Sequence, residues 1–186
     1  MSGFSKENRK IGNKTLIEMY KKNLVTLDAI IETIVKQKEV SRAMIKELCI
    51  FISNYSSGTK TILCRYLQEN GICNAKINNM STAELIVNFK KQVSKDTSLP
   101  CSVNTELQLI AFGIRNNLSH NLNQVEYLEK VVNDSGLKKF INFLNKISIE
   151  SRQIEQLFER KIETIEEKIT ESKQLEKEIY HFGIKL

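Results

Sequence analysis

The chain has 186 residues, of which 41% are hydrophobic, and its formal net charge is +6. This composition excludes an intrinsically disordered chain and suits one folded domain with length to spare for an extension. No apolar run approaches the roughly 20 residues that a membrane-spanning helix needs, so no membrane contact is expected. Tryptophan is absent, which argues against a nucleic-acid reader built on exposed aromatic platforms.

The charge is unevenly distributed. Residues 1–147 carry 21 basic and 13 acidic side chains, whereas residues 148–186 carry 7 basic and 9 acidic ones. A basic body favours a polyanionic partner, because phosphates that become neutralised release their counterions. Many soluble proteins have a surplus of this size, so the charge by itself does not decide for nucleic acid.

None of the four cysteines belongs to a CxxC pair; they are Cys49, Cys64, Cys73 and Cys101. The polar opening of the chain lacks the apolar core of a signal peptide, so we expect reduced thiols in a cytoplasmic protein. Cys49 and Cys64 have apolar neighbours and are expected to be buried. Metal-ligand spacing is absent and only two histidines are present, so neither a metal nor another cofactor is expected.

Helical periodicity dominates the first part of the chain. Residues 1–12 indicate a flexible basic lead-in, and apolar side chains three and four positions apart then predict a helix over about 13–40. Ser41 can cap a second helix that ends at Gly71. Within that helix, Gly58 marks either a kink or a place where another helix packs closely.

Shorter elements follow. Residues 71–80 are expected to form a loop, and Ser81 with Glu84 forms the capping box of a helix that ends near residue 95. After a loop that contains Pro100, a helix begins at Asn104 or Thr105. Its expected buried stripe is Leu107, Ile110, Ile114 and Leu118.

Three more helices are predicted, over 123–132, 137–147 and 149–180. The last is amphipathic and charged, and its isoleucines do not keep strict heptads, which favours packing on the body over a long coiled coil. The expected fold is therefore all-α: an up-and-down helical bundle with a long C-terminal amphipathic helix. The corresponding regions are a flexible segment 1–12, a bundle 13–147 and the helix region 148–186, which lies either on the bundle or at a dimer interface.

Most catalytic patterns are absent, and the stretch IRNNLSHN remains. Asn116 and His120 are four residues apart and share a helix face, and the long side chain of Arg115 can reach the same surface. An arginine can hold phosphate oxygens through paired hydrogen bonds, and a histidine can either accept the 2′-hydroxyl proton or protonate the leaving oxygen. The bland interpretation is a solvated arginine and a histidine favoured by the helix dipole.

Arg115, Asn116 and His120, late in a chain of long helices, resemble the motif of the HEPN superfamily (higher eukaryotes and prokaryotes nucleotide-binding). That motif has an arginine, often followed by a polar residue, and a histidine after four to six further positions. The resemblance covers roughly residues 13–147. It implies a bundle of four or five helices and a homodimer in which two motifs form one composite site.

The resemblance also implies a metal-independent endoribonuclease that leaves 2′,3′-cyclic phosphate and 5′-hydroxyl ends. Such enzymes are typical of toxin–antitoxin and antiviral defence systems, so the implied partners are RNA (tRNA or mRNA) and an antitoxin or a larger defence complex. Two departures stand out. Leu122 occupies the position of the tyrosine that some related toxins have as their modification site, and no acidic residue lies between Glu47 and Glu69, where some groups carry one.

Two alternatives stay open. The first is a non-catalytic HEPN domain that binds RNA or a nucleotide, or that serves as a scaffold. The second is a helical protein-interaction module, for which the long charged helix after Ile149 is the motivating feature.

Overall fold

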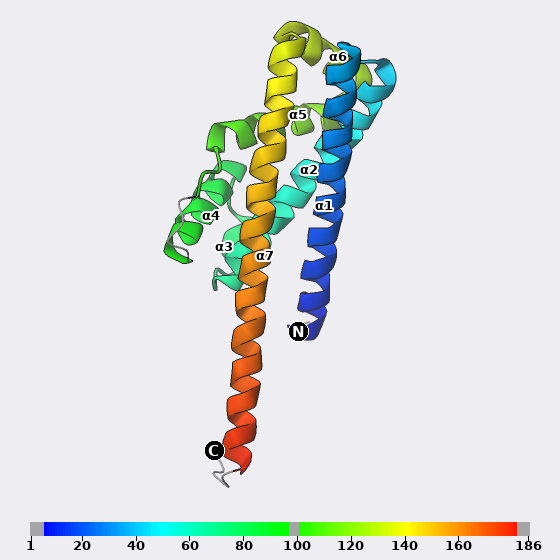
Figure 1. Ribbon diagram of the computed structural model, residues 1–186. Helices are drawn as coiled ribbons and strands as arrows, with labels where there is room; N and C mark the ends of the chain where they lie inside the picture. The colour runs from blue at the N-terminus through cyan, green and yellow to red at the C-terminus, as the bar shows by residue number, and fades with distance from the viewer. Residues whose placement is uncertain (1–5, 97–100, 182–186) are drawn as a thin grey trace.

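The computed structural model of the chain describes residues 6–96 and 101–181 (Figure 1). Every regular element within these residues is an α-helix, which confirms the all-α class. The helices are α1 (Lys6–Gln37), α2 (Arg42–Glu69), α3 (Asn74–Asn78), α4 (Thr82–Asp96), α5 (Thr105–His120), α6 (Gln124–Ser135) and α7 (Leu137–His181).

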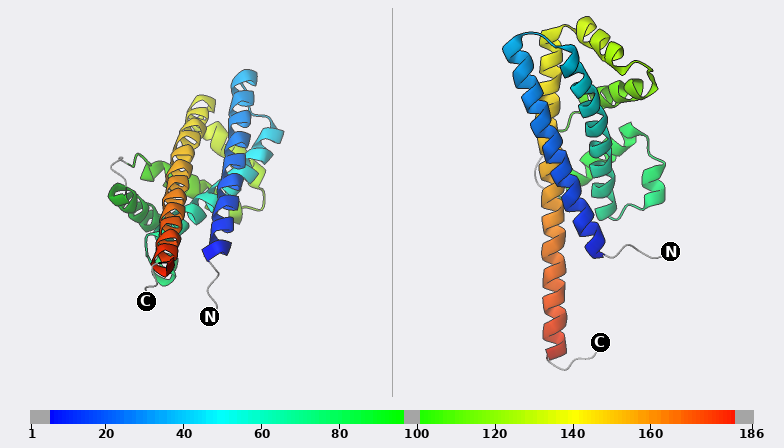
Figure 2. Two further views of the ribbon diagram at one scale, coloured as in Figure 1. Left: turned by 60° about the horizontal axis from the view of Figure 1, so that its bottom comes forward. Right: turned by 90° about the vertical axis from the view of Figure 1, so that its right-hand side faces the viewer.

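The helices form two layers. In Figure 1, α1 and α7 lie side by side at the front and run in opposite directions, and α2 lies behind them with the shorter helices. The right-hand view of Figure 2 shows the same division from the side. The last part of α7 extends well beyond the bundle. Within the described residues, no helix is long and apolar enough to cross a membrane.

The helix α1 begins earlier than predicted, at Lys6, so residues 6–12 do not form a flexible lead-in. Lysine, glutamate and arginine in this segment are good helix formers, and Gly12 lowers helix stability by only about 1 kcal/mol relative to alanine. Residues 1–5 of the predicted lead-in lie outside the described residues.

Both predicted ends of α2 are confirmed. The Ser41 hydroxyl accepts a hydrogen bond from the Met44 backbone N–H at 3.3 Å. At the other end, Gly71 has a φ of +80°, and the N–H groups of Gly71 and Ile72 bond back to the carbonyls of Gln68 and Leu67. A left-handed residue is needed to close this pair of bonds, and glycine adopts that conformation without steric cost.

Two predicted boundaries were wrong. The expected loop 71–80 contains the single-turn helix α3, whose Ile77 is buried. The predicted break at 147/148 does not exist, because α7 is continuous from Leu137 to His181. No proline or glycine interrupts it, and the Ser148 hydroxyl donates to Asp28 of α1 at 2.7 Å, so the serine is used to attach the helix rather than to end it.

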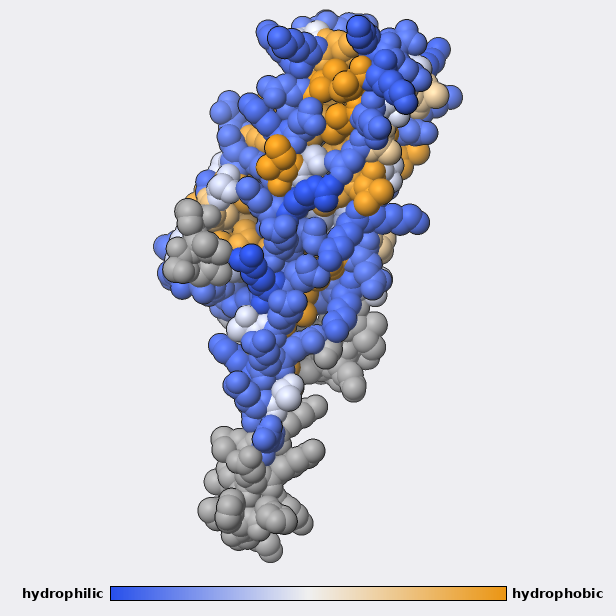
Figure 3. All heavy atoms as spheres, in the orientation of Figure 1, coloured by the Kyte–Doolittle hydropathy of each residue, from blue (hydrophilic) through white to orange (hydrophobic). Residues whose placement is uncertain are grey.

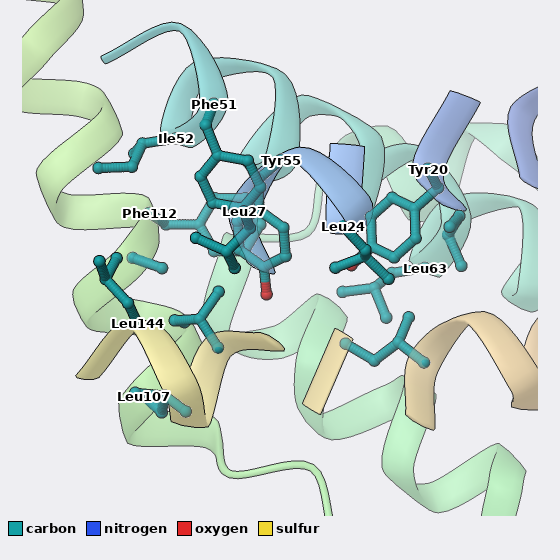
Figure 4. Packing of buried hydrophobic residues seen from close by; sticks show 14 of the residues in the cluster. Tyr20, Leu24, Leu27, Phe51, Ile52, Tyr55, Leu63, Leu107, Phe112 and Leu144 are labelled. Atoms are coloured by element: carbon teal, nitrogen blue, oxygen red, sulfur yellow. The ribbon is translucent and has the colours of Figure 1, made fainter. Parts of the chain in front are cut away.

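The hydrophobic core lies between the two layers, and α1, α2, α5 and α7 all contribute to it (Figure 4). Its largest fully buried side chains include Tyr20, Tyr55 and Tyr66. The Tyr20 hydroxyl and the Thr59 hydroxyl are 2.8 Å apart, which satisfies both groups inside the core. Of the two cysteines expected to be buried, Cys49 is buried and Cys64 is half-buried, and both are free thiols.

Gly58 is a close-packing position rather than a kink. It lies within the uninterrupted helix α2, and a Cβ atom added to it would stand 3.1 Å from Cδ2 of Tyr20. This is closer than an ordinary carbon–carbon contact. The absent side chain therefore lets α1 approach α2 at the level of the Tyr20–Thr59 contact.

Charged side chains line the surface where α1 meets α7, which we call the α1–α7 seam. Six of them are Lys14, Lys21, Asp28, Arg152, Glu155 and Glu159. Acids and bases of the two helices pair across it. Lys21 Nζ lies 2.9 Å from Glu159 and 3.3 Å from Glu155, and Arg152 bonds to Asp28. In Figure 3 this face is mostly hydrophilic, with hydrophobic atoms gathered in its upper part.

Candidate functional site

The helix α5 carries all three candidate site residues. Asn104 is its N-cap, as predicted, and its side-chain oxygen accepts the Leu107 N–H at 3.1 Å. The helix ends at His120, where the Asn121 backbone N–H still bonds to the Asn117 carbonyl. The motif therefore occupies the last turns of a helix, as the sequence predicts.

The buried face of α5 differs in part from the predicted stripe. Leu107 and Leu118 are buried, but Ile110 is 47% exposed and Ile114 is only half-buried. The core-facing side chains are instead Leu107, Gln108, Ala111, Phe112 and Leu118. The helix is rotated so that the polar Gln108 faces the interior, which hydrophobic periodicity cannot anticipate because it assigns polar residues to the surface.

A buried polar network explains this rotation. The Gln108 amide donates to Glu150 Oε2 of α7 at 2.8 Å, and its oxygen accepts from the Tyr55 hydroxyl of α2 at 2.7 Å. The other Glu150 oxygen accepts the Asn104 backbone N–H at 3.0 Å. Burial raises the pKa of the Glu150 carboxyl, although the bonds from Gln108 and Asn104 oppose this effect. Four hydrogen-bonding groups on three helices thus fix the position of α5.

Arg115 and Asn116 lie together. The Arg115 side chain is half-buried, and its Nη1 donates to the Asn116 side-chain oxygen at 3.2 Å. His120 is exposed, one helical turn after Asn116, and makes no hydrogen bond among the described residues. The structure thus joins two of the three candidate residues directly and leaves the histidine free to meet solvent or another molecule.

The side-chain amides of two asparagines hold the segment that joins α5 to α6. The Asn117 side chain donates to the Tyr127 hydroxyl of α6 at 3.0 Å, and Asn123 caps α6 by accepting the Glu126 N–H at 3.3 Å. Leu122 lies between the two helices and is fully exposed. The end of α5 is therefore attached to α6 while the side chain at position 122 points into solvent.

Arg115 and Asn116 line an open hollow of about 590 Å³ between α2 and α5, to which α3 and α4 also contribute. His120 does not line it. Most of the other wall is the outer face of α2, including Ser56, Ser57, Lys60, Thr61, Cys64 and Arg65. Phe112 is a buried apolar part of the wall.

The hollow is electrically positive. None of its lining residues is acidic, whereas Lys60, Arg65 and Arg115 all carry positive charge. Burial raises the pKa of the Cys64 thiol, and the positive charges of Lys60 and Arg65 oppose that rise. The positive charges of Lys60 and Arg65 therefore reach a side chain that lines the hollow. None of the three cations forms an ion pair within the described residues.

Sequence reasoning did not assign Lys60, Arg65 or Ser56 to a site. A signal was present, because the stretch from Glu47 to Glu69 has no acidic residue between its ends. That stretch is the part of α2 that walls the hollow. Its lack of acids indicates a positive wall, not only the absence of a helper acid.

Comparison with protein-family models, curated proteins and solved structures finds no match to this chain. Among the described residues, no group of three or more histidine, cysteine or acidic side chains could hold a metal ion. The site is therefore characterised by its own geometry: a guanidinium and an amide at the wall of a positive hollow, followed by an exposed imidazole.

Proposed function

We propose that this protein is a metal-independent endoribonuclease of the HEPN type, in which Arg115 and His120 act on RNA and Asn116 supports them. One arrangement supports the proposal. A half-buried arginine lines an acid-free hollow with two further cations, and an exposed histidine follows it on the same helix. Positive charge that is already in place can stabilise the charge that grows on phosphoryl oxygens during cleavage.

In the proposed reaction the ribose 2′-oxygen attacks the adjacent phosphorus while a base accepts the hydroxyl proton. The bond to the 5′-oxygen breaks, and that oxygen leaves with a proton from an acid. The products are a 2′,3′-cyclic phosphate and a 5′-hydroxyl. The His120 imidazole can serve in either proton transfer, and the Arg115 guanidinium can bind the phosphoryl oxygens.

The proposed active form is a homodimer. A single motif offers one imidazole, that of His120, whereas the reaction needs both a base and an acid. Two motifs that meet across a two-fold axis would provide both. The exposure of His120 is compatible with such a contact. The proposed setting is a toxin–antitoxin or antiviral defence system in which the substrate is tRNA or mRNA.

The test is incubation of the purified protein with total RNA in EDTA. Wild type should cleave, and Arg115→Ala and His120→Ala should each lower the rate by about 100-fold or more. Arg160→Ala is the matched control, because Arg160 is an exposed arginine on α7 outside the hollow. Unchanged cleavage in both motif variants would show that Arg115 and His120 do not act on RNA. An active protein that is strictly monomeric would rule out the composite site.

A second candidate is a domain that binds RNA or a nucleotide without cleaving it. The observation that favours it is the position of His120, which does not line the hollow that holds Arg115 and Asn116. RNA binding by wild type without any product, in the same assay, would select this function.

A further inference from the structure

The proposed chemistry uses three residues of α5 and leaves the opposite wall of the hollow without a role. That wall is the outer face of α2, where Lys60 and Arg65 lie. Lys60 Nζ has no hydrogen-bond partner among the described residues, and Arg65 makes one long bond of 3.4 Å, to Gln68. Both cations are therefore available to a ligand.

Lys60 and Arg65 approach the hollow from two sides of α2. They are five residues apart, which corresponds to roughly 7.5 Å along the helix axis and a turn of roughly 140° about it, and both line the hollow. Their two cationic groups can therefore contact different oxygens of one ligand. Arg115 faces the same space from α5, so a ligand in the hollow would have positive charge on two sides.

Ser56 is a second, independent observation. Its side chain is 1% exposed, lies in the wall of the hollow, and has a hydroxyl with no hydrogen-bond partner. A buried hydroxyl without a partner destabilises the fold, and native structures rarely leave one unpaired. A ligand oxygen in the hollow would supply the missing partner.

We propose that the hollow between α2 and α5 is a phosphate-ester binding site, in which Lys60, Arg65 and Arg115 contact phosphate oxygens and Ser56 donates to one of them. A volume of about 590 Å³ is larger than a single phosphate needs and falls in the usual range for ligand sites. The hollow can therefore hold more than a phosphate group, and the proposed ligand is a nucleotide unit, either within an RNA strand or free.

As an account of substrate binding, this inference rests on the proposed function, because it places the strand beside Arg115. In that account the α2 wall holds a phosphate that neighbours the cleaved one. As a phosphate site, the inference is independent of cleavage, so binding and cleavage are measured separately.

The experiment uses the full chain with His120→Ala, so that RNA stays intact. Binding of a fluorescent single-stranded RNA 12-mer is measured by anisotropy, and binding of adenosine 5′-monophosphate by calorimetry. The pocket variants are Lys60→Gln and Arg65→Gln. The matched controls are Lys22→Gln and Arg160→Gln, which change exposed cations outside the hollow. Circular dichroism verifies that every variant folds.

Each pocket variant is expected to weaken RNA binding by about 10-fold or more, since a hydrogen bond to a charged group contributes about 1.5–3 kcal/mol. Each should also lower the salt dependence of binding by about one phosphate contact. The control variants should change affinity by less than about 2-fold, as expected for distant charges that salt screens.

The two nucleotide sources give different results. If the strand binds tightly and the mononucleotide weakly, the ligand is RNA; if both bind with equal affinity, it is a free nucleotide, and the pocket variants must then weaken both. Equal losses in pocket and control variants, or no loss in either, overturn the phosphate site. Binding without cleavage by wild type removes the proposed function alone. Cleavage by wild type, together with RNA binding that both pocket variants leave unchanged, removes this inference alone.

Discussion

The α1–α7 seam and the hollow between α2 and α5 use positive charge in opposite ways. In the seam, Lys21 and Arg152 have acidic partners on the facing helix. In the hollow, three cations share one space with no acidic lining residue. Paired surface charges contribute little free energy, and each charge is already neutralised by its partner. Unpaired cations that share one space repel one another, and a bound anion relieves this repulsion.

The helix α2 lies between the hydrophobic core and the hollow. One face carries Tyr55, Thr59 and Tyr66 into the core, and the other carries Lys60 and Arg65 into the hollow. The same residue type therefore has acidic partners in the seam and none in the hollow, and we propose that the hollow uses its cations for binding. Substitutions in the two regions should therefore have different effects.

The largest effect is expected from reversing one charge in each region. Lys60→Glu should weaken RNA binding by about 100-fold and leave the free energy of unfolding unchanged, because Lys60 has no partner to lose. Lys21→Glu should leave binding unchanged and lower stability, because it places a third acid beside Glu155 and Glu159. Anisotropy and urea unfolding measure the two quantities. Loss of binding in both variants would contradict this difference between the two regions.

The network behind the hollow gives the next largest effect. Gln108→Ala leaves both the Tyr55 hydroxyl and one Glu150 oxygen without their partner in the core. We expect a loss of about 2–4 kcal/mol in the free energy of unfolding, since each such group costs about 1–3 kcal/mol. Gln156→Ala, at an exposed position of α7, serves as the control. Equal stability of the two variants would show that the network does not hold α5.

Two glycines offer a matched pair of smaller effects. Gly113→Ala on α5 meets no atom within 4 Å and should stabilise the fold by up to about 1 kcal/mol through helix propensity. Gly58→Ala gains the same propensity but presses on Tyr20, which costs about 1–3 kcal/mol in a well-packed core. Thermal unfolding compares the two. A Gly58→Ala protein as stable as Gly113→Ala would mean that α1 can move away from α2.

The smallest effect concerns pH. Because burial raises the pKa of Glu150 above its ordinary value of 4.5, the folded chain holds a proton that the unfolded chain releases as the pH rises from about 4.5. The free energy of unfolding should therefore fall over that window, up to the raised pKa. Glu150→Gln removes the titration and should flatten the profile. Urea unfolding between about pH 4 and pH 7 measures it, and parallel profiles would show that Glu150 titrates normally.

The sequence predicts local features that depend on neighbouring residues. The Ser41 cap, the Ser81–Glu84 capping box and the Gly71 end of α2 are all confirmed, since each is formed by residues within a few positions of one another. The placement of Arg115–His120 at the end of α5 is confirmed for the same reason. Helix continuity was harder to judge: nothing in the local pattern shows that Ser148 attaches α7 to α1 instead of breaking it.

The chain by itself determined that this is an all-α protein, where most of its helices begin and end, and that Arg115, Asn116 and His120 lie at the end of one helix. These properties follow from backbone hydrogen bonding and side-chain periodicity over short distances. Only the tertiary structure decided that Arg115 faces Lys60 and Arg65 across a hollow, that Ser56 is buried there without a partner, and that Gln108 is inside. Those contacts join residues about 40 to 60 positions apart, and their geometry depends on how α5 packs against α2 and α7, which no local pattern encodes.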